Sequence, residues 1–257
     1  MPKTIMLIHG AWLTPAAWHP FKTRYESLGY ICLAPPWPYN ERPVTELKRS
    51  PHPDFAKLSI KAIVDHYHKL ITPLPEPPIL IGHSFGGLFV QLLLDRGLGA
   101  AGIAIDPAPP HGVLPSAQAT RSALPVLLTW MGWSRTVTMS FPHFAANFAQ
   151  TLPADEQRAA YDRYVVPTPG RIYFESALGI GNRVNFGNSQ RPPLLLIAGD
   201  QDRTIEISMV RAAHGKHQQS KAITAFKAMR GRDHWLIAAP GWEDVADETI
   251  KWAVSVA

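Results

Sequence analysis

The stretch Ile79-Leu80-Ile81-Gly82-His83-Ser84-Phe85-Gly86-Gly87-Leu88 decides the fold of this chain. It opens with three apolar residues, as a buried strand does, and it leads into the apolar run Leu88–Arg96, which is long enough for a helix. The Gly-X-Ser-X-Gly pattern between them is typical of a sharp strand-to-helix turn that strains a serine and exposes its hydroxyl. Gly82 and Gly86 leave room for such a turn, and Gly87 lets the helix pack close to the sheet. We therefore interpret Ser84 as a nucleophile, although a glycine-rich corner with an incidental serine has the same bare motif.

Outside this stretch, short apolar runs alternate with segments of helical character. We expect strands at residues 5–8, 30–34, 102–106, 194–198 and 222–228, and helices at residues 14–28, 58–71, 206–217 and 242–253. Strands and helices that alternate at this spacing predict an α/β fold, with a mostly parallel sheet of about six strands flanked by helices.

The alternation breaks between residues 107 and 190, where aromatic, helix-like patches replace clean strands. We interpret this segment as an inserted helical cap, and residues 1–106 and 191–257 as the core domain. A proline-rich loop, Pro35–Pro53, is long enough to suggest a role at the mouth of a site.

The composition limits which classes of protein this chain can belong to. With 257 residues, 46% of them hydrophobic, the chain can form one large domain or a core with an inserted cap. The net charge of +5 comes from scattered basic residues, and the mild concentration from Arg211 to Arg232 is better explained by a solvated surface than by a nucleic-acid site. The lone Cys32 lies in an apolar run, cannot form an internal disulfide and suggests a reducing compartment.

The N-terminal run Ile5–Ile8 is too short for a signal peptide or a membrane span. We expect a cytoplasmic monomer or homodimer with no nucleic-acid or membrane partner. The sequence contains no metal-ligand cluster or phosphate-binding loop, so we also expect no metal and no cofactor.

Candidate catalytic residues follow the predicted strands, whose carboxyl ends gather at one edge of a parallel sheet. A serine nucleophile needs a base, and the base needs an acceptor that fixes its tautomer. His234 and Asp202 fit these roles in the chain order Ser…Asp…His. Asp106 and Asp200 compete with Asp202 as the acid; we favour Asp202, then Asp106, then Asp200.

Two backbone N–H groups are expected to bind the oxyanion of the tetrahedral intermediate: that of Phe85, which follows the nucleophile, and that of Ala11, in the loop after the first strand. We interpret His9 as a brace for this loop, and His83 as a residue that supports the site from beside the nucleophile.

These motifs together resemble the α/β-hydrolase superfamily, and within it the branch of small serine esterases and hydroxynitrile-lyase-like proteins. The resemblance rests on four motifs in order along nearly the whole chain: His9-Gly10-Ala11-Trp12, Gly82–Gly87, Gly199-Asp200-Gln201-Asp202 and Asp233-His234. It implies the α/β-hydrolase fold, Asp202 as the acid, Ala11 as an oxyanion donor and a cap between the fourth strand and the strand before the acid.

Two positions narrow the chemistry that the resemblance implies. Hydroxynitrile lyases of this branch carry a lysine directly after the catalytic histidine, where this chain has Trp235. Haloalkane dehalogenases carry an aspartate at the turn, where this chain has Ser84.

The sequence therefore predicts a serine hydrolase that cleaves carboxylic esters of apolar small molecules through an acyl-enzyme intermediate. The residues expected to contact substrate are Trp12, His83, Trp130, Trp133, Phe144 and Trp235. The same machinery could open lactones, hydrolyse amides or carbon–carbon bonds, or catalyse perhydrolysis without a cofactor. The alternative from another class is a small-molecule sensor on a hydrolase fold.

Overall fold

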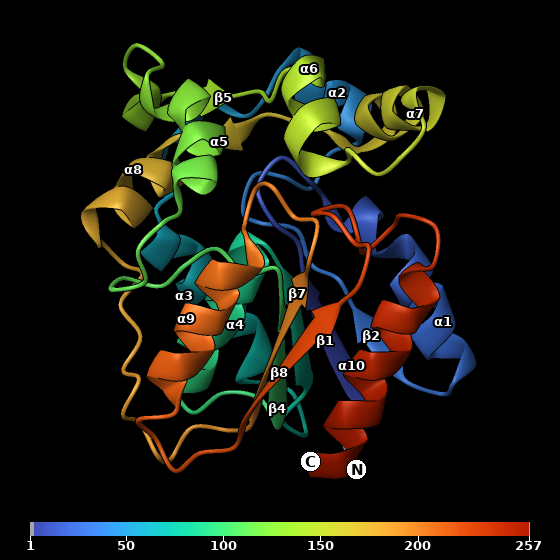
Figure 1. Ribbon diagram of the computed structural model, residues 1–257, viewed down its shortest axis with the longest axis vertical. Helices are drawn as coiled ribbons and strands as arrows, with labels where there is room; N and C mark the ends of the chain where they lie inside the picture. Colours follow the sequence, from blue (N-terminus) through green and yellow to red (C-terminus); the bar gives the residue numbers. More distant parts are fainter. Residues whose placement is uncertain (1–2, 257) are drawn as a thin grey trace.

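Six parallel strands form the centre of the molecule (Figure 1). The computed structural model describes residues 3–256. The strands lie in the order β2-β1-β3-β4-β7-β8, and each neighbouring pair is parallel. Their bounds are β1 Thr4–Ile8, β2 Ile31–Leu33, β3 Ile79–His83, β4 Ala101–Ile105, β7 Leu194–Gly199 and β8 Thr224–Met229. The expected α/β-hydrolase sheet is confirmed.

Burial follows strand position in this sheet. Every residue of β1, β3, β4 and β7 is buried, whereas the edge strands β2 and β8 are partly exposed. Parallel strands covered on both faces need continuous apolar sequences, because neither face meets water. This explains why the central strands were readable from the sequence as unbroken apolar runs. Cys32, on β2, is buried, and burial raises the pKa of its thiol to about 12.

Helices cover both faces of the sheet. Figure 1 shows α1 (His19–Ser27) and α10 (Trp242–Val256) on one face, and α3 (Ile60–Ile71), α4 (Phe85–Asp95) and α9 (Ile207–His217) on the other. The 3-10 turn η1 (Pro15–Trp18) precedes α1, and Thr14 caps it by accepting a hydrogen bond from the Ala16 N–H. The expected helix at residues 14–28 is therefore divided into a 3-10 turn and an α-helix.

The segment between β4 and β7, which we call the cap segment (residues 107–190), lies over the carboxyl ends of the strands (Figure 1). Its elements are α5 (Ala117–Leu127), η3 (Gly132–Ser134), β5 (Thr136–Val137), α6 (Phe141–His143), the π-helix η4 (Phe144–Phe148), α7 (Ala154–Tyr164), β6 (Thr168–Pro169) and α8 (Arg171–Leu178). We expected helical patches and no clean strand here, and the segment also contains the two short strands β5 and β6, which pair antiparallel. Two-residue strands are too short to leave a period-2 pattern in the sequence.

The expected loop Pro35–Pro53 also contains regular structure: α2 (Val44–Arg49) and the start of the 3-10 helix η2 (Pro53–Lys57). The Lys48 ammonium on α2 donates to the backbone carbonyl of Asp162 on α7 at 2.6 Å, so this segment contacts the cap segment. Among the described residues, no helix has the length and apolar character needed to span a membrane.

Candidate active site

Ser84 lies in the turn between β3 and α4 with a strained backbone. Its φ of 56° and ψ of −121° fall outside the regions that a serine ordinarily occupies. The turn is possible because its flanking positions lack side chains: a Cβ at Gly82 would lie 2.2 Å from the Gly86 carbonyl oxygen, and a Cβ at Gly86 would lie 2.0 Å from the Ile8 carbonyl oxygen. The glycine spacing read from the sequence therefore matches a real steric requirement.

The loop after β1 runs directly past the serine. A Cβ at Gly10 would lie 2.7 Å from the Ser84 Cβ, so only glycine permits this approach. The N–H groups of Ala11 and Phe85 donate no hydrogen bond within residues 3–256. Phe85 is the first residue of α4, where a helix leaves its N–H without an internal acceptor. The two expected oxyanion donors are thus unused by the protein itself.

His9 braces this loop. Its Nδ1–H donates to the Gly10 carbonyl at 2.9 Å, its Nε2 accepts from the Trp37 N–H at 3.3 Å, and its ring stacks on Trp37 with centroids 4.8 Å apart. Burial lowers the pKa of His9 to about 4, so the ring is neutral at pH 7. These contacts occupy both ring nitrogens and suit a structural role rather than proton transfer.

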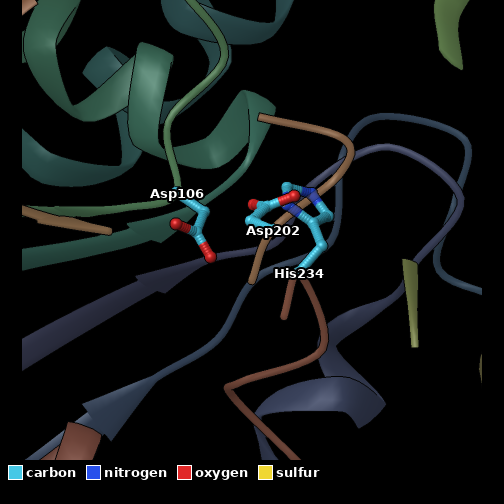
Figure 2. A group of neighbouring side chains, drawn as sticks. All are labelled: Asp106, Asp202 and His234. Carbon is cyan, nitrogen blue, oxygen red and sulfur yellow. The ribbon is translucent and has the colours of Figure 1, made fainter. Parts of the chain in front are cut away.

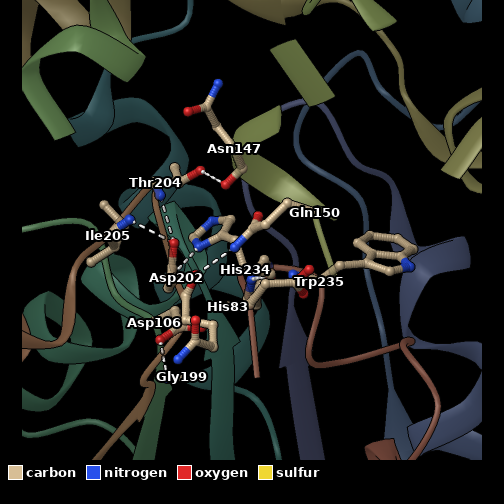
Figure 3. Close-up of polar contacts among 12 residues, drawn as sticks. His83, Asp106, Asn147, Gln150, Gly199, Asp202, Thr204, Ile205, His234 and Trp235 are labelled. Atoms are coloured by element: carbon tan, nitrogen blue, oxygen red, sulfur yellow. Dashed lines mark hydrogen bonds and ion pairs between the residues drawn. The ribbon is translucent and has the colours of Figure 1, made fainter. Parts of the chain in front are cut away.

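His234 and Asp202 meet across the loops that follow β8 and β7 (Figure 3). His234 Nδ1 lies 2.5 Å from Asp202 Oδ2, and both side chains are fully buried. The other carboxylate oxygen of Asp202 accepts from the Thr204 N–H at 2.6 Å and from the Ile205 N–H at 2.8 Å. These donors fix the Asp202 carboxylate, which in turn fixes the ring of His234 with its proton on Nδ1.

Burial lowers the pKa of His234 below its ordinary value of 6.5, so the imidazole is neutral at pH 7. Its Nε2 is buried without a hydrogen-bond partner among the described residues. This nitrogen and the Ser84 hydroxyl are therefore not hydrogen-bonded to each other in this structure, and Nε2 retains a free lone pair for a proton. Such contacts are often long in proteins without bound substrate and shorten when the substrate arrives.

Asp106 lies beside Asp202 and His234, but among the described residues it forms no hydrogen bond with the His234 ring. It follows β4 with a φ of 40°, and its Oδ1 accepts from the Gly199 N–H at 2.8 Å. Figure 2 shows its carboxyl next to that of Asp202; one polar atom from each of Asp106, Asp202 and His234 lies within 4.8 Å of the others. Burial, and then the charge of Asp202, raise the pKa of Asp106 well above its usual range. Burial also raises the pKa of Asp202, whereas the N–H groups of Ile205 and Thr204 favour its charged form. Of the two carboxyls, that of Asp202 is the one hydrogen-bonded to His234.

His83 supports the loop that carries His234. Its Nε2–H donates to the backbone carbonyl of His234 at 2.8 Å, and the two rings pack with centroids 4.6 Å apart. Burial, with a smaller effect of His234, lowers the pKa of His83 well below 6.5, so two neutral rings face each other. Its burial and its hydrogen bond to His234 suit the supporting role that we expected.

One group of hydrogen bonds at this site was not expected from the sequence. These bonds join the cap segment to the loops that carry Asp202 and His234 (Figure 3). Asp233 accepts from the N–H and the hydroxyl of Thr151 at 2.8 and 2.7 Å, and also from the Trp235 N–H at 3.0 Å. The Thr204 hydroxyl donates to the Asn147 carbonyl at 2.9 Å, and the Gln150 amide donates to the Gln201 carbonyl. We call residues 146–151 the clamp. Asp233 belongs to the sequence motif Asp233-His234, but nothing in the local sequence indicated that Thr151 is its partner.

Aromatic residues surround the same loops. The edge of Phe148, at the end of the π-helix η4, meets His234 with centroids 4.5 Å apart and planes at 80°. Phe144 and Trp235, both expected to contact substrate, are buried in this cluster against Phe148. On the serine side, Tyr173 packs against Phe85 and Trp12 with centroids 5.0 and 5.1 Å apart.

The structure places the predicted substrate-contact residues in three different settings. Trp12 lies beside the expected oxyanion donors, and its indole N–H donates to the Val137 carbonyl at 3.0 Å. His83, Phe144 and Trp235 are buried behind or beside His234. Trp130 and Trp133 are 78% and 55% exposed on the surface of the cap segment, and the structure does not bring them into contact with Ser84, Asp202 or His234.

The comparisons with known proteins agree with this fold. The family model described as "Alpha/beta hydrolase family" matches residues 5–248. An extracellular α/β-hydrolase from a Paenibacillus species superposes with a TM-score of 0.72 at 20% identity, over 98% of this chain and 99% of that one. A monoacylglycerol lipase from Paleococcus ferrophilus gives 0.69 at 17% identity, over 100% and 96% of the two chains. A methylesterase from Arabidopsis gives 0.69 at 14% identity, over 99% of each.

Identities this low show a common fold and no more. Comparison with curated proteins yields no significant match.

Proposed function

Because the chain belongs to the alpha/beta hydrolase family, we propose that it is a serine hydrolase that cleaves carboxylic esters of apolar small molecules. The observation that carries the proposal is the strained backbone of Ser84 at the carboxyl end of β3, in a chain that also orients a neutral, buried His234 through Asp202. A binding protein has no need of a serine held in a costly backbone conformation, whereas a nucleophile does.

In the proposed reaction, Ser84 Oγ attacks the ester carbonyl while His234 Nε2 takes the hydroxyl proton. The oxyanion that forms is stabilised by the N–H groups of Ala11 and Phe85, each contributing about 3 kcal/mol to the transition state. The tetrahedral intermediate collapses with departure of the alkoxide, to which His234 returns the proton. A water molecule then attacks the acyl-serine by the same route and releases the acid.

Asp202 keeps the His234 proton on Nδ1 and stabilises the imidazolium that forms during each step. The N–H groups of Thr204 and Ile205 hold the Asp202 carboxylate in place without forming a competing ion pair. The aromatic wall of Trp12, Phe85 and Tyr173 beside the oxyanion donors favours an apolar acyl or aryl group.

The alternatives use the same groups on other bonds: lactone opening, amide or carbon–carbon hydrolysis, and perhydrolysis. No contact in the structure favours one of these over ester hydrolysis, and the choice depends on the shape of the acyl pocket. The Trp235 side chain is buried where hydroxynitrile lyases carry a lysine, so we do not propose lyase activity.

Hydrolysis of p-nitrophenyl esters, from acetyl to dodecanoyl, by the wild type and Ser84→Ala tests the proposal. Turnover that peaks at one chain length and disappears in the variant supports a serine esterase. Equal turnover by both proteins would refute the mechanism. A folded wild type that hydrolyses no ester would redirect attention to lactones, carbon–carbon bonds or a sensor role.

A further inference from the structure

The outer end of the cap segment exposes an apolar surface that the proposed chemistry does not use. Its members follow one another between α5 and η3: Leu124 is 39% exposed, Leu128 77%, Trp130 78%, Met131 39% and Trp133 55%. We call these five residues the apolar corner. Leu124 and Leu128 are one helical turn apart and so share a face of α5. In Figure 1 the turn after α5 (green) lies at the far end of the long axis from the start of β1 and the end of α10.

The turn that presents these side chains is firmly built. Met131 has a φ of 54°, a left-handed conformation that a methionine rarely adopts. Gly132 is buried under α8, where a Cβ would lie 3.0 Å from both Phe174 Cε2 and the Val126 carbonyl oxygen. The Ser134 hydroxyl donates to the Met131 carbonyl at 3.0 Å. The tryptophans are therefore held outward on an ordered turn, and large exposed apolar groups on such a support mark an interaction surface.

The stretch of chain that carries the apolar corner has basic residues and no acidic ones. Residues 107–154 contain no aspartate or glutamate. Arg121 and Arg135 flank the corner, are exposed, and form no ion pair within residues 3–256. The acids on the neighbouring elements are already neutralised: Asp54 on η2 pairs with Lys57 at 2.8 Å, and Glu175 on α8 is buried against Arg171 at 2.7 Å.

We propose that the apolar corner docks on an anionic lipid surface. Tryptophan suits the boundary between headgroups and acyl chains because its ring is apolar and its N–H is polar. Exposed arginines with no acidic neighbour attract anionic headgroups. A second copy of the chain fits less well, since a two-fold contact through the apolar corner would gather the arginines of both copies at one interface, and residues 107–154 supply no carboxylate to pair with them. The proposal departs from our expectation of no membrane partner, which rested on the lack of a spanning segment.

Flotation with lipid vesicles tests the proposal and needs no turnover, so its outcome is independent of the proposed function. We expect the wild type to float with vesicles that contain phosphatidylglycerol in phosphatidylcholine and much less with phosphatidylcholine alone. Trp130→Ser with Trp133→Ser should weaken binding by about tenfold for each tryptophan removed. Arg121→Gln with Arg135→Gln should weaken it by about fivefold for each charge, and only on anionic vesicles.

The matched control is Leu28→Ser with Ile223→Ser, two side chains that are 58% and 55% exposed elsewhere on the molecule. It should bind as the wild type does, and circular dichroism of every variant checks folding. Absence of binding by the wild type, or equal binding by the tryptophan variant and the control, overturns the proposal. Sedimentation that shows a dimer lost on Trp130→Ser with Trp133→Ser, without vesicle binding, would also overturn it in favour of a second copy.

Discussion

The two halves of the candidate active site are held in place by different means. On the nucleophile side, the turn at Ser84 packs tightly against the loop after β1. Glycines at the contact points lack side chains, so the backbone segments can lie this close together. On the acid–base side, the loops of Asp202 and His234 are held by hydrogen bonds to the clamp of the cap segment. The serine turn is thus held by tight backbone packing, whereas the acid–base side depends, besides its contacts with His83 and with its own loop, on a few polar contacts with a distant segment. The cap segment also contacts the loop after β1, through the Trp12 indole N–H and the Val137 carbonyl. Changes confined to the clamp should therefore disturb the histidine side and leave the turn at Ser84 in place.

The largest expected effect comes from removing the nucleophile itself. Ser84→Ala should lower kcat by about a millionfold, because the remaining members of a triad give little help without it. Single-turnover assays with an ester that the wild type hydrolyses measure the loss, and unfolding curves of both proteins show that the fold persists. A variant with most of its activity would mean that the strained turn serves some other purpose.

Next in size is a comparison of the two neighbouring aspartates. Asp202→Asn replaces an acceptor with an amide that can turn a donor toward His234 and favour the wrong tautomer, so kcat should fall by about ten-thousandfold. Asp106→Asn mimics the protonated carboxyl, since its amide can still accept from Gly199 and donate to Asp202, and the loss should stay below about tenfold. Steady-state kinetics of the matched pair give both numbers. A severe loss in Asp106→Asn with a mild one in Asp202→Asn would move the acid to Asp106.

Adding one methyl group at Gly86 tests whether the turn at Ser84 is rigid. Gly86→Ala places a Cβ against the Ile8 carbonyl and should lower the free energy of unfolding by about 3 kcal/mol. Gly215→Ala is the control, because nothing lies within 4 Å of a Cβ there, and in the last turn of α9 alanine should stabilise the protein slightly. Urea unfolding of the two variants measures both changes in stability. If the unfolding midpoint of Gly86→Ala were similar to that of Gly215→Ala, the turn would have to adjust to the added methyl group at little cost.

The clamp should have a smaller and more selective effect. Thr151→Val removes the hydroxyl that donates to Asp233 and should lower kcat/KM by about tenfold, the value of one hydrogen bond to a charged group. Thr138→Val, at an exposed cap position, is the matched control and should leave kcat/KM unchanged. If Thr151→Val lost stability but kept its kcat/KM, the clamp would be structural and the proposed difference between the two halves would fail.

The smallest effect concerns pH. Because burial lowers the pKa of His234, the ring stays neutral and able to accept a proton as the pH falls through 6.5. The acid limb of kcat/KM should therefore lie below pH 6.5, the ordinary value for histidine. A pH profile of wild-type kcat/KM, with circular dichroism at each pH to separate ionisation from unfolding, tests this. An acid limb at or above pH 6.5 would mean that the charge of Asp202 outweighs burial.

The same difference between the halves explains what the sequence could predict. The turn at Ser84 is encoded within ten residues, and its glycines, strand and helix were all legible locally. The central strands were equally clear because sheet burial on both faces requires unbroken apolar runs. Asp202 could be placed after β7, but its advantage over Asp106 depended on which carboxyl reaches His234 in three dimensions.

The clamp could not be predicted, since Thr151 and Asp233 are 82 residues apart and neither belongs to a pattern that names the other. Similarly, the cap aromatics looked alike in the sequence, but tertiary packing buried Phe144 and left Trp130 exposed. Aromatic content predicts that a segment packs or binds something, and only the fold decides which.

The strand order also determines when the protein can become active during its synthesis. β4 pairs with β7, yet the whole of residues 106–193 must be made between them. At roughly 5 to 20 residues per second, the ribosome needs several seconds to produce that segment. Throughout this interval the outer edge of β4, apolar and unpaired, is available to wrong partners and to chaperones. Ser84 is thus made before the cap segment, whereas Asp202 and His234 follow it, so a chain that has grown only as far as the cap segment lacks two of the three groups of the proposed hydrolysis.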